Sequence, residues 1–394
     1  MTTNVKRRQL LAGAAGLTAA SALHAPFVLA QPAKIKVGMM LPSSGTFAAL
    51  GASITNGFRL AVEEAGGNLA GREIEYYTVD DESNPAKAPE NINRLIERDK
   101  VDVVIGTVHS GVALGMAKVA REAGTLMLVP NAGAGAITGP LCSPNIFRTS
   151  FSNWQPVHPM GKVMAAKGHK TAVFITWNYA AGKESSASFK EGFEAAGGKV
   201  VKELLLPFPN VEFLPLFAEV AALNPDGVAC FFAGGGGVKF IQDYKRAGLK
   251  DKIPVYSTFL TEGVLRAVKD DAQGIETTMH YADALPIARD AEFRRKYAVT
   301  FKLQPDVYAM QGFDTGLLLA QAMAAVKGDF GNRDGMIQAM EGATIDSPRG
   351  KWTMSKAHNP IMDIYLRKVV GEENKYQSVA WKALADPARG CRMG

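Results

Sequence analysis

The sequence is poor in the residues that build metal centres and disulfide-rich scaffolds. Its 394 residues include only 3 cysteines and 6 histidines, and they are not spaced as metal ligands are. Apolar residues make up 47% and charged residues 21%, a globular composition that excludes a disordered chain. After residue 30 no apolar run reaches 18 residues, so we expect no membrane span in the mature protein. We also expect no metal and no cofactor.

The motifs of common enzyme classes are missing as well. G-x-S-x-G, S-x-x-K and H-E-x-x-H do not occur. His109 and Ser110 are neighbours in sequence, which does not make a nucleophile–base pair. The glycine clusters at 133–138 and 234–239 match neither a phosphate loop nor a complete G-x-G-x-x-G fingerprint. We therefore expect a protein that is not an enzyme and binds no nucleotide; an exported enzyme or a structural protein remain the alternatives.

Charge of one sign is not concentrated in the body of the chain. Three of the 44 basic residues lie in the first thirty residues, which hold no acid, so the other 41 nearly balance the 38 acidic residues. A nucleic-acid binder needs a concentrated basic face, and we expect no such partner.

The first thirty residues have the features of an export signal. Lys6-Arg7-Arg8 precedes a modest apolar stretch, and Val28-Leu29-Ala30 offers a small-residue cleavage site before Gln31. The Arg7-Arg8 pair followed by Leu10-Leu11 resembles a twin-arginine signal, with a general secretory signal as the alternative. We expect the mature protein in the periplasm.

From residue 35 onward the chain alternates between buried strands and amphipathic helices. The alternation runs to about residue 130 and restarts at residue 146, which predicts an α/β fold with two mostly parallel sheets covered by helices on both faces. The predicted strands are 35–41, 74–80, 101–106, 126–130, 146–149, 171–176, 199–206, 227–232, 254–257, 275–281, 350–354 and 361–370. The predicted helices are 51–65, 85–100, 110–123, 154–167, 184–196, 213–223, 238–247, 290–301, 307–326 and 333–340. Hinges are expected near 149–155, 282–286 and 358–361.

Loops after the predicted strands are the expected ligand site, because ligands of open α/β sheets bind at the carboxyl ends of the strands. These loops are poor in charge and rich in hydroxyl and aromatic side chains. Ser110 opens a predicted helix, where unpaired backbone N–H groups favour an anion, although it could serve only as the helix cap. The candidates for hydrogen bonding are Ser43, His109, Ser110 and Asn131, and those for stacking are Phe47, Trp177, Tyr179 and Phe259, each of which could instead be structural.

The three cysteines permit one disulfide in an oxidising compartment. Cys230 lies inside the apolar run 227–232, where a buried thiol is expected. Cys142 and Cys391 lie in polar, turn-rich segments. We predict that they form a disulfide that ties the C-terminal tail to the first α/β half of the chain, its first lobe.

The order and spacing of several segments resemble the leucine/isoleucine/valine-binding type of periplasmic solute receptor. The resemblance covers the whole mature chain and rests on the segments 42–51, 80–81, 84–85, 106–110, 130–133, 248–249 and 308–314. It implies a type I periplasmic binding protein, with two doubly wound Rossmann-like lobes joined by three hinge crossings. The implied function is a receptor, expected to be monomeric, that closes on a small ligand and delivers it to an ABC permease.

The resemblance also implies a division of the chain and further ligand contacts. We expect a signal at 1–30, a first lobe at 31–150 plus 285–360, a second lobe at 151–284 plus 361–380, and a tail at 381–394. Ala132, Gly133, Gly235 and Tyr308 join the expected ligand-binding residues.

Departures from the family pattern bear on the ligand. A carboxylate of the second lobe normally receives the ammonium group of an amino acid, but here the segment 257–260 holds no acid before Glu262. Because an unpaired buried ammonium would cost several kcal/mol, we expect a carboxylate ligand without an ammonium group, such as a benzoate or cinnamate derivative. Branched-chain amino acids and amides are the alternatives.

Overall fold

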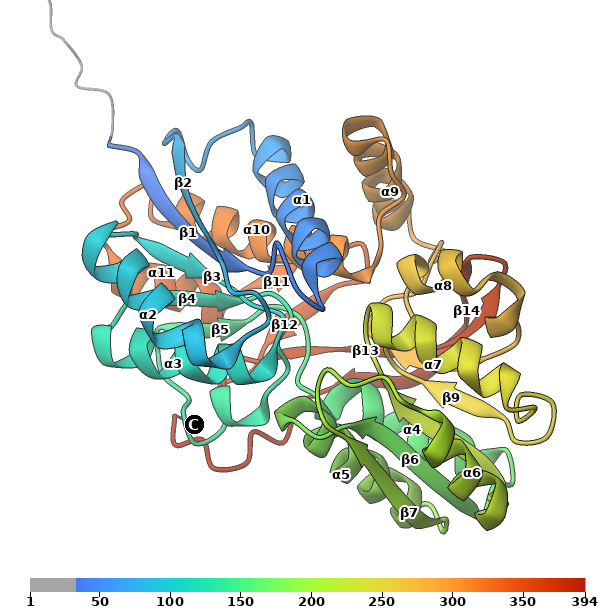
Figure 1. The fold of residues 1–394 in the computed structure, drawn as a ribbon. Helices are drawn as coiled ribbons and strands as arrows, with labels where there is room; N and C mark the ends of the chain where they lie inside the picture. The colour runs from blue at the N-terminus through green and yellow to red at the C-terminus, as the bar shows by residue number, and fades with distance from the viewer. Residues whose placement is uncertain (1–32, 394) are drawn as a thin grey trace, which may run out of the picture. The chain divides into compact units, whose positions relative to one another are not determined.

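The first sheet consists of five parallel strands in the order β2-β1-β3-β4-β5 (Figure 1). The computed structural model describes residues 33–393, and its contacts place everything from Lys34 onward in one compact unit. Strands β1, β3 and β4 are buried almost throughout, which explains their uninterrupted apolar sequences. The strands are β1 (Ile35–Leu41), β2 (Ile74–Asp80), β3 (Val103–Ile105), β4 (Leu126–Val129) and β5 (Ile146–Arg148).

The second sheet is mixed and has the order β11-β12-β13-β10-β9-β8-β6-β7, with β14 paired to β13. Its central strands from β10 to β7 are parallel, whereas β13 runs antiparallel to β10. The strands are β6 (Thr171–Trp177), β7 (Lys199–Leu206), β8 (Gly227–Phe231), β9 (Val255–Ser257), β10 (Glu276–Met279), β11 (Thr344–Ile345), β12 (Trp352–Met354), β13 (Pro360–Val370) and β14 (Glu373–Leu384).

Helices cover both faces of the first sheet. On one face, Met40 and Val104 of the sheet pack against α2 and α3; on the other, Val37 and Ile105 pack in the cluster that holds Phe58 of α1. The α-helices are α1 (Ala48–Glu64), α2 (Ala88–Asn93), α3 (Ser110–Ala123), α4 (Trp154–Ala166), α5 (Ala180–Ala195), α6 (Leu214–Leu223), α7 (Gly235–Arg246), α8 (Glu262–Val268), α9 (Ala288–Phe301), α10 (Val307–Ala325) and α11 (Arg333–Glu341). We call the first sheet with α1, α2, α3 and α10 the first lobe, together with β11 and β12, which pack against α10. The remaining strands of the second sheet, β6 to β10, β13 and β14, form the second lobe with α4 to α8.

The chain passes between the two lobes in three segments. These are residues 149–153 between β5 and α4, residues 280–287 between β10 and α9, and residues 355–359 between β12 and β13. They overlap the three expected hinges, the third at residues 358–359 alone. Hinge motion itself and the expected lobe boundaries stay predictions.

Most predicted elements are confirmed, and the α/β class with its doubly wound parallel strands is confirmed with them. The strands at 35–41, 74–80 and 199–206 and the helix at 110–123 have the predicted bounds. The predicted helix at 85–100 is wrong as one element. It is divided into a 3₁₀ turn (Pro85–Lys87), α2 and a π-helical turn (Arg94–Arg98), since Pro89 lies at the start of α2 and cannot donate a backbone hydrogen bond. Strand β14 continues to Leu384, beyond the expected start of the tail at 381.

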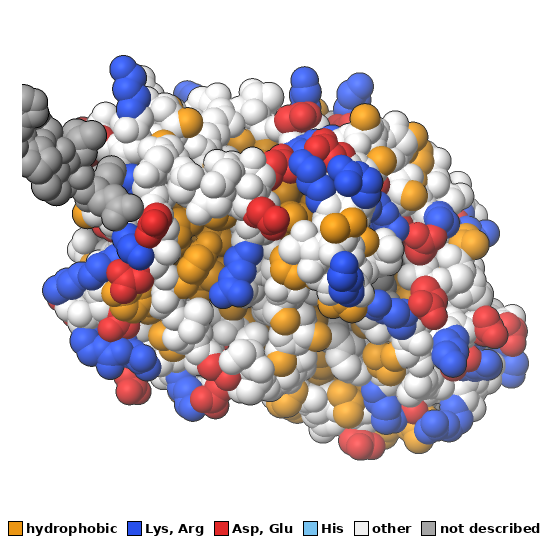
Figure 2. Space-filling model, turned by 90° about the horizontal axis from the view of Figure 1, so that it is seen from above, with side chains coloured by type: hydrophobic (Ala, Val, Ile, Leu, Met, Phe, Trp, Pro, Cys, Tyr) orange, Lys and Arg blue, Asp and Glu red, His pale blue; other side chains and the backbone are white. Residues whose placement is uncertain are grey.

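Charges of both signs are mixed on the face of the molecule seen in Figure 2. Lys and Arg side chains alternate there with Asp and Glu, as the nearly balanced composition predicts. This face therefore carries no concentrated basic patch.

Candidate functional site

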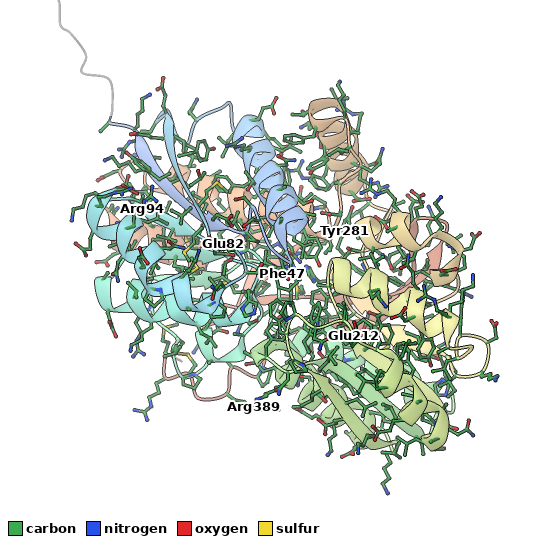
Figure 3. All side chains as sticks on the ribbon, viewed as in Figure 1. Phe47, Glu82, Arg94, Glu212, Tyr281 and Arg389 are labelled. Carbon is green, nitrogen blue, oxygen red and sulfur yellow. A yellow bond between two sulfur atoms is a disulfide. The ribbon has the colours of Figure 1, made fainter. Side chains whose placement is uncertain are left out.

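A small cavity lies between the lobes at the carboxyl ends of their parallel strands. Its walls come from the segments after β1, β3 and β4 of the first lobe, and after β6, β8 and β9 of the second. About 20 Å³ of it is open to the centre of a water molecule. Phe47 lies at the middle of this region in Figure 3, between the two groups of elements. The lining residues are Phe47, Leu50, Val108, Ser110, Asn131, Gly133, Phe151, Asn153, Tyr179, Ala181, Phe231, Ala233, Phe259 and Tyr308.

Four helices begin at this cavity. Phe47 is the N-cap of α1, Ser110 is the first residue of α3, and Ala181 and Tyr308 lie in the first turns of α5 and α10. The amino end of a helix carries partial positive charge and unpaired N–H groups. The described lining residues include no charged side chain, and these helix ends offer the cavity backbone N–H groups that favour an anion over a cation.

His109, not Ser110, caps helix α3. Its Nδ1 accepts the backbone N–H of Gly111 at 3.0 Å and that of Val112 at 3.4 Å. Burial lowers the pKa of His109 to about 4, so the ring is neutral near pH 7 and can accept these bonds. The alternative role considered for Ser110, that of the cap, is therefore wrong, and the Ser110 hydroxyl is available to the cavity.

Aromatic side chains close the cavity from both lobes. His109 lies 4.9 Å from Tyr179 and 5.0 Å from Phe208, and Phe47 lies 5.7 Å from Phe208 between ring centroids. Phe259 packs at 4.7 Å against Phe231 within the second lobe. Phe208 is a residue that the sequence analysis missed, because it belongs to the loop after β7, which follows an edge strand and has no glycine or hydroxyl signal.

Trp177 was predicted to stack on a ligand but lies beneath the cavity wall. It packs against Gly236, where an added side chain would overlap its ring. Its Nε1 donates to the backbone oxygen of Asn210 at 2.8 Å. Because Gly236 has no side chain, the Trp177 indole can pack in the core of the second lobe.

Asn131 connects the cavity to a buried polar cluster at the crossings. Its Nδ2 donates to Oε1 of Gln311 at 2.7 Å, and Nε2 of Gln311 lies 3.2 Å from Nε2 of His280. Burial, with the nearby charges of Arg349 and Arg367, lowers the pKa of His280 well below its usual value. Asn131 is thereby held in one orientation by neutral groups.

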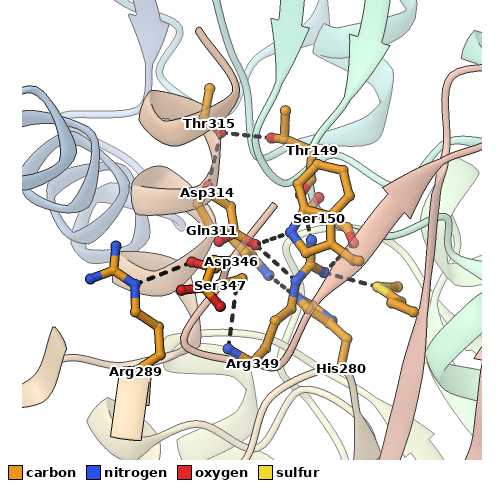
Figure 4. Close-up of polar contacts among 12 residues, drawn as sticks. Thr149, Ser150, His280, Arg289, Gln311, Asp314, Thr315, Asp346, Ser347 and Arg349 are labelled. Atoms are coloured by element: carbon orange, nitrogen blue, oxygen red, sulfur yellow. Dashed lines mark hydrogen bonds and ion pairs between the residues drawn. The ribbon is translucent and has the colours of Figure 1, made fainter. Parts of the chain in front are cut away.

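Arg349 anchors the first crossing in the same cluster (Figure 4). It pairs with Asp314 at 2.8 Å and donates to the backbone oxygens of Thr149 and Ser150 at 2.8 and 2.7 Å. The ion pair is fully buried, and Trp352 donates to the same carboxylate at 2.9 Å. Removing one partner would leave a buried charge unpaired, so this cluster fixes the backbone from which Phe151 and Asn153 extend.

Asn153 is one of the lining residues that the sequence analysis missed. Gly133 leaves the space that Asn153 occupies, since an added Cβ at Gly133 would overlap its side chain. Nδ2 of Asn153 donates to Oε2 of Glu184 at 2.7 Å. A short stretch of sequence could not identify Asn153 as a lining residue, because its position depends on a contact between the loop after β4 and the first crossing.

The other expected residues lie around the cavity without lining it. Ser43 is exposed, and its N–H donates to Oδ1 of Asp80 at 2.9 Å. The backbone oxygen of Ala132 accepts a hydrogen bond from Arg148. Gly235 is the first residue of α7 and has open space around it.

The structure joins Cys142 to Cys391, with their Cα atoms 5.6 Å apart, and leaves Cys230 as a buried thiol. Among the described residues, no group of His, Cys, Asp or Glu is arranged to hold a metal ion. Within residues 33–393, no helix is long and apolar enough to cross a membrane. The expected export signal lies outside the described residues.

Two α/β lobes around a small uncharged cavity define a receptor for a small molecule, and the chain belongs to the family described as periplasmic binding protein, whose model matches residues 34–375. The chain is thus the solute-binding component of an ABC transporter. A solute-binding protein of an ABC transporter from R. palustris, solved in complex with benzoate, is 47% identical. That alignment covers 91% of this chain and 99% of the other, with a TM-score of 0.89.

Two further relatives extend the comparison. A solute-binding protein from Rhodopseudomonas palustris BisB5, in complex with 3,4-dihydroxybenzoic acid, is 32% identical over 90% of this chain and 99% of its own, with a TM-score of 0.84. The Leu/Ile/Val-binding protein homolog 6 of Brucella melitensis is 27% identical over 377 residues, 93% of either chain.

Proposed function

We propose that this protein is an exported receptor that closes on a small aromatic carboxylate and delivers it, unchanged, to an ABC permease. The observation that carries the proposal is the cavity: it is small, walled by aromatic rings and ringed by helix amino ends, and its described lining residues carry no charge. The membership of the chain in a periplasmic family supports export to the periplasm.

The size of the cavity suits a flat ring. An aromatic ring is about 3.5 Å thick, whereas a water probe is about 2.8 Å across. In a slot as thick as the ring, the centre of a water molecule can therefore move through a layer only about 0.7 Å deep. Over the area of a benzoate, this layer has a volume on the order of 20 Å³. The volume of the cavity, about 20 Å³, is of this order, which supports a flat ligand over a bulky one.

The charge of the cavity favours a carboxylate that lacks an ammonium group. The Ser110 hydroxyl and the amino ends of α3 and α5 offer hydrogen-bond donors to an anion. The alternative ligand, a branched-chain amino acid, would bring an ammonium group to a cavity whose described lining residues include no carboxylate. The benzoate and dihydroxybenzoate bound by the two R. palustris proteins support the same choice.

A titration with four matched ligands tests the proposal. Benzoate should bind best. Benzamide lacks the negative charge, cyclohexanecarboxylate has a thicker ring, and leucine adds the ammonium group, so each should bind at least tenfold more weakly, the loss that about 1.4 kcal/mol produces. Calorimetry on protein freed of bound ligand measures the affinities, and chromatography of the released ligand shows whether it is unchanged.

The variant Ser110→Ala tests the expected position of the carboxylate. Loss of a hydrogen bond to a charged group should weaken benzoate binding about 10- to 100-fold. The unfolding midpoint without ligand should not fall, because His109 caps the helix. Leucine binding more tightly than benzoate would refute the ligand class, and unchanged benzoate affinity in Ser110→Ala would refute the role of this hydroxyl.

A further inference from the structure

Glu184 connects the two lobes beside the cavity. It lies in the first turns of α5, in the second lobe, and its Oε2 accepts the backbone N–H of Gly135 at 3.0 Å. Gly135 belongs to the loop after β4, in the first lobe. The same oxygen accepts Nδ2 of Asn153, a lining residue, at 2.7 Å.

The Glu184 carboxylate sets the orientation of the Asn153 amide. An ionised carboxylate only accepts hydrogen bonds, so the amide nitrogen of Asn153, and not its oxygen, must face it. The backbone holds this arrangement, because the Asn153 N–H donates to the oxygen of Gly133 at 2.7 Å. Glu184 is half-buried; burial raises its pKa, while the bonds from Asn153 and Gly135 and the charge of Arg148 favour the ionised form.

The orientation of Asn153 in turn acts on Ser110. Nδ2 of Asn153 also lies 3.5 Å from Oγ of Ser110, at the long end of hydrogen-bond range. With the amide nitrogen as donor, the Ser110 oxygen accepts, and its hydroxyl hydrogen is left to point elsewhere. Since Ser110 lines the cavity, that hydrogen can be donated to an anion bound there.

We propose that Glu184 is a positioning residue that couples closure of the lobes to the ligand contact, because it joins α5 of the second lobe to Gly135 of the first lobe and, through Asn153, directs the Ser110 hydroxyl into the cavity. The proposal rests on the proposed function, a receptor that closes on an anion. It adds a specific residue, outside the lining, whose loss should accelerate ligand release.

A double-mutant cycle between Glu184 and Ser110 tests this route, since residues that act as a unit show non-additive effects. Glu184→Met keeps the length of the side chain but removes the oxygen that accepts both bonds, and it should weaken benzoate binding about tenfold, mainly through faster dissociation. In the Ser110→Ala background the same change should cost less than about twofold. An equal loss in both backgrounds would mean a merely structural contact and would overturn the proposal.

Glu191→Met is the matched control on the same helix. Glu191 binds Arg389 at 2.8 Å and Nε1 of Trp154 at 3.3 Å, and neither partner lines the cavity. Its benzoate affinity should stay within about twofold of the wild type. Near-identical near-ultraviolet circular dichroism of the variants checks that each is folded.

Hydrogen exchange at the Gly135 amide provides a readout that does not depend on the ligand class. The wild type should protect this amide, more so with benzoate, and Glu184→Met should lose the protection. Equal exchange in both proteins would overturn the proposal. If the wild type binds leucine and not benzoate, the proposed ligand class fails, and the same cycle run with leucine still decides the role of Glu184.

Discussion

His109 has two tasks that only its neutral ring can perform together. Its Nδ1 accepts two backbone N–H groups at the start of α3, and its ring packs between Tyr179 and Phe208. Protonation would replace the acceptor with a donor and place a positive charge at the positive end of a helix. Burial lowers the pKa of His109 to about 4, so the ring stays neutral near pH 7 and both tasks are compatible.

The stability of the protein should therefore fall as the pH drops from about 6.5 to 4. In the unfolded chain His109 takes up a proton near pH 6.5, whereas in the folded protein it stays neutral down to about pH 4. The folded state binds fewer protons in this window, so it loses up to about 3 kcal/mol of unfolding free energy there, and nothing more is lost below it.

The comparison with His109→Asn isolates this effect from the other buried histidines. Asparagine is a good N-cap and does not titrate. Urea unfolding at pH 7, 5.5 and 4 should show the wild type losing about 3 kcal/mol relative to the variant. A difference between the two proteins that does not change with pH would contradict the assignment.

How far single residues could be predicted depends on how local their cause is. Ser110, Asn131 and Phe259 follow strands, and the rule that ligands meet the ends of parallel strands places them at the cavity. The positions of the Asn153 and Trp177 side chains depend on the missing side chains of Gly133 and Gly236, which lie elsewhere in the sequence. No pattern within a short window carries that information.

Among the helices, α1 and α10 pack with their backbones unusually close. Gly57 of α1 faces the oxygen of Ala309, and Gly312 of α10 faces the oxygen of Ile54. A methyl group at either glycine would overlap a backbone atom, which cannot move without displacing its helix. The glycines therefore set the separation of the two helices on one face of the first sheet.

The variant Gly312→Ala should lower the unfolding free energy by about 2 to 4 kcal/mol, since overpacking outweighs the gain in helix propensity. Gly263→Ala is the control, because Gly263 lies in α8, is exposed and has open space around it. That variant should be neutral or slightly stabilising. Thermal unfolding of the two variants gives the comparison, and equal midpoints would contradict the packing argument.

Element bounds were predictable where burial is continuous or where turn residues flank an element. Strand β1 and helix α3 match because buried apolar residues recur with the right period. The largely exposed strands β2 and β7 match because glycine, proline or aspartate residues lie directly beside them. β14 was missed because most of its side chains are partly or fully exposed, so its sequence has no buried stripe. Its pairing with β13 is a tertiary effect that the sequence of the strand does not encode alone.

The two lobes are joined by more than their three crossings. After β14 of the second lobe the chain returns to the first lobe, where Cys391 pairs with Cys142 (Figure 1). On the way, Asp386 accepts hydrogen bonds from Ser152 and Asn359, which lie in two of the crossings. The tail is thus a fourth, covalent connection.

This connection should contribute strongly to stability, because it closes a loop of 249 residues. The loop-entropy model gives about 5 kcal/mol for such a loop, and measured values run from about 2 to 5 kcal/mol. The double variant Cys142→Ser/Cys391→Ser should therefore lose about 3 to 5 kcal/mol of unfolding free energy. A reductant should produce the same loss in the wild type and no change in the variant, whose remaining thiol, Cys230, is buried. If the reductant destabilised both proteins equally, the effect would arise elsewhere and the tail would not be a stabilising tether.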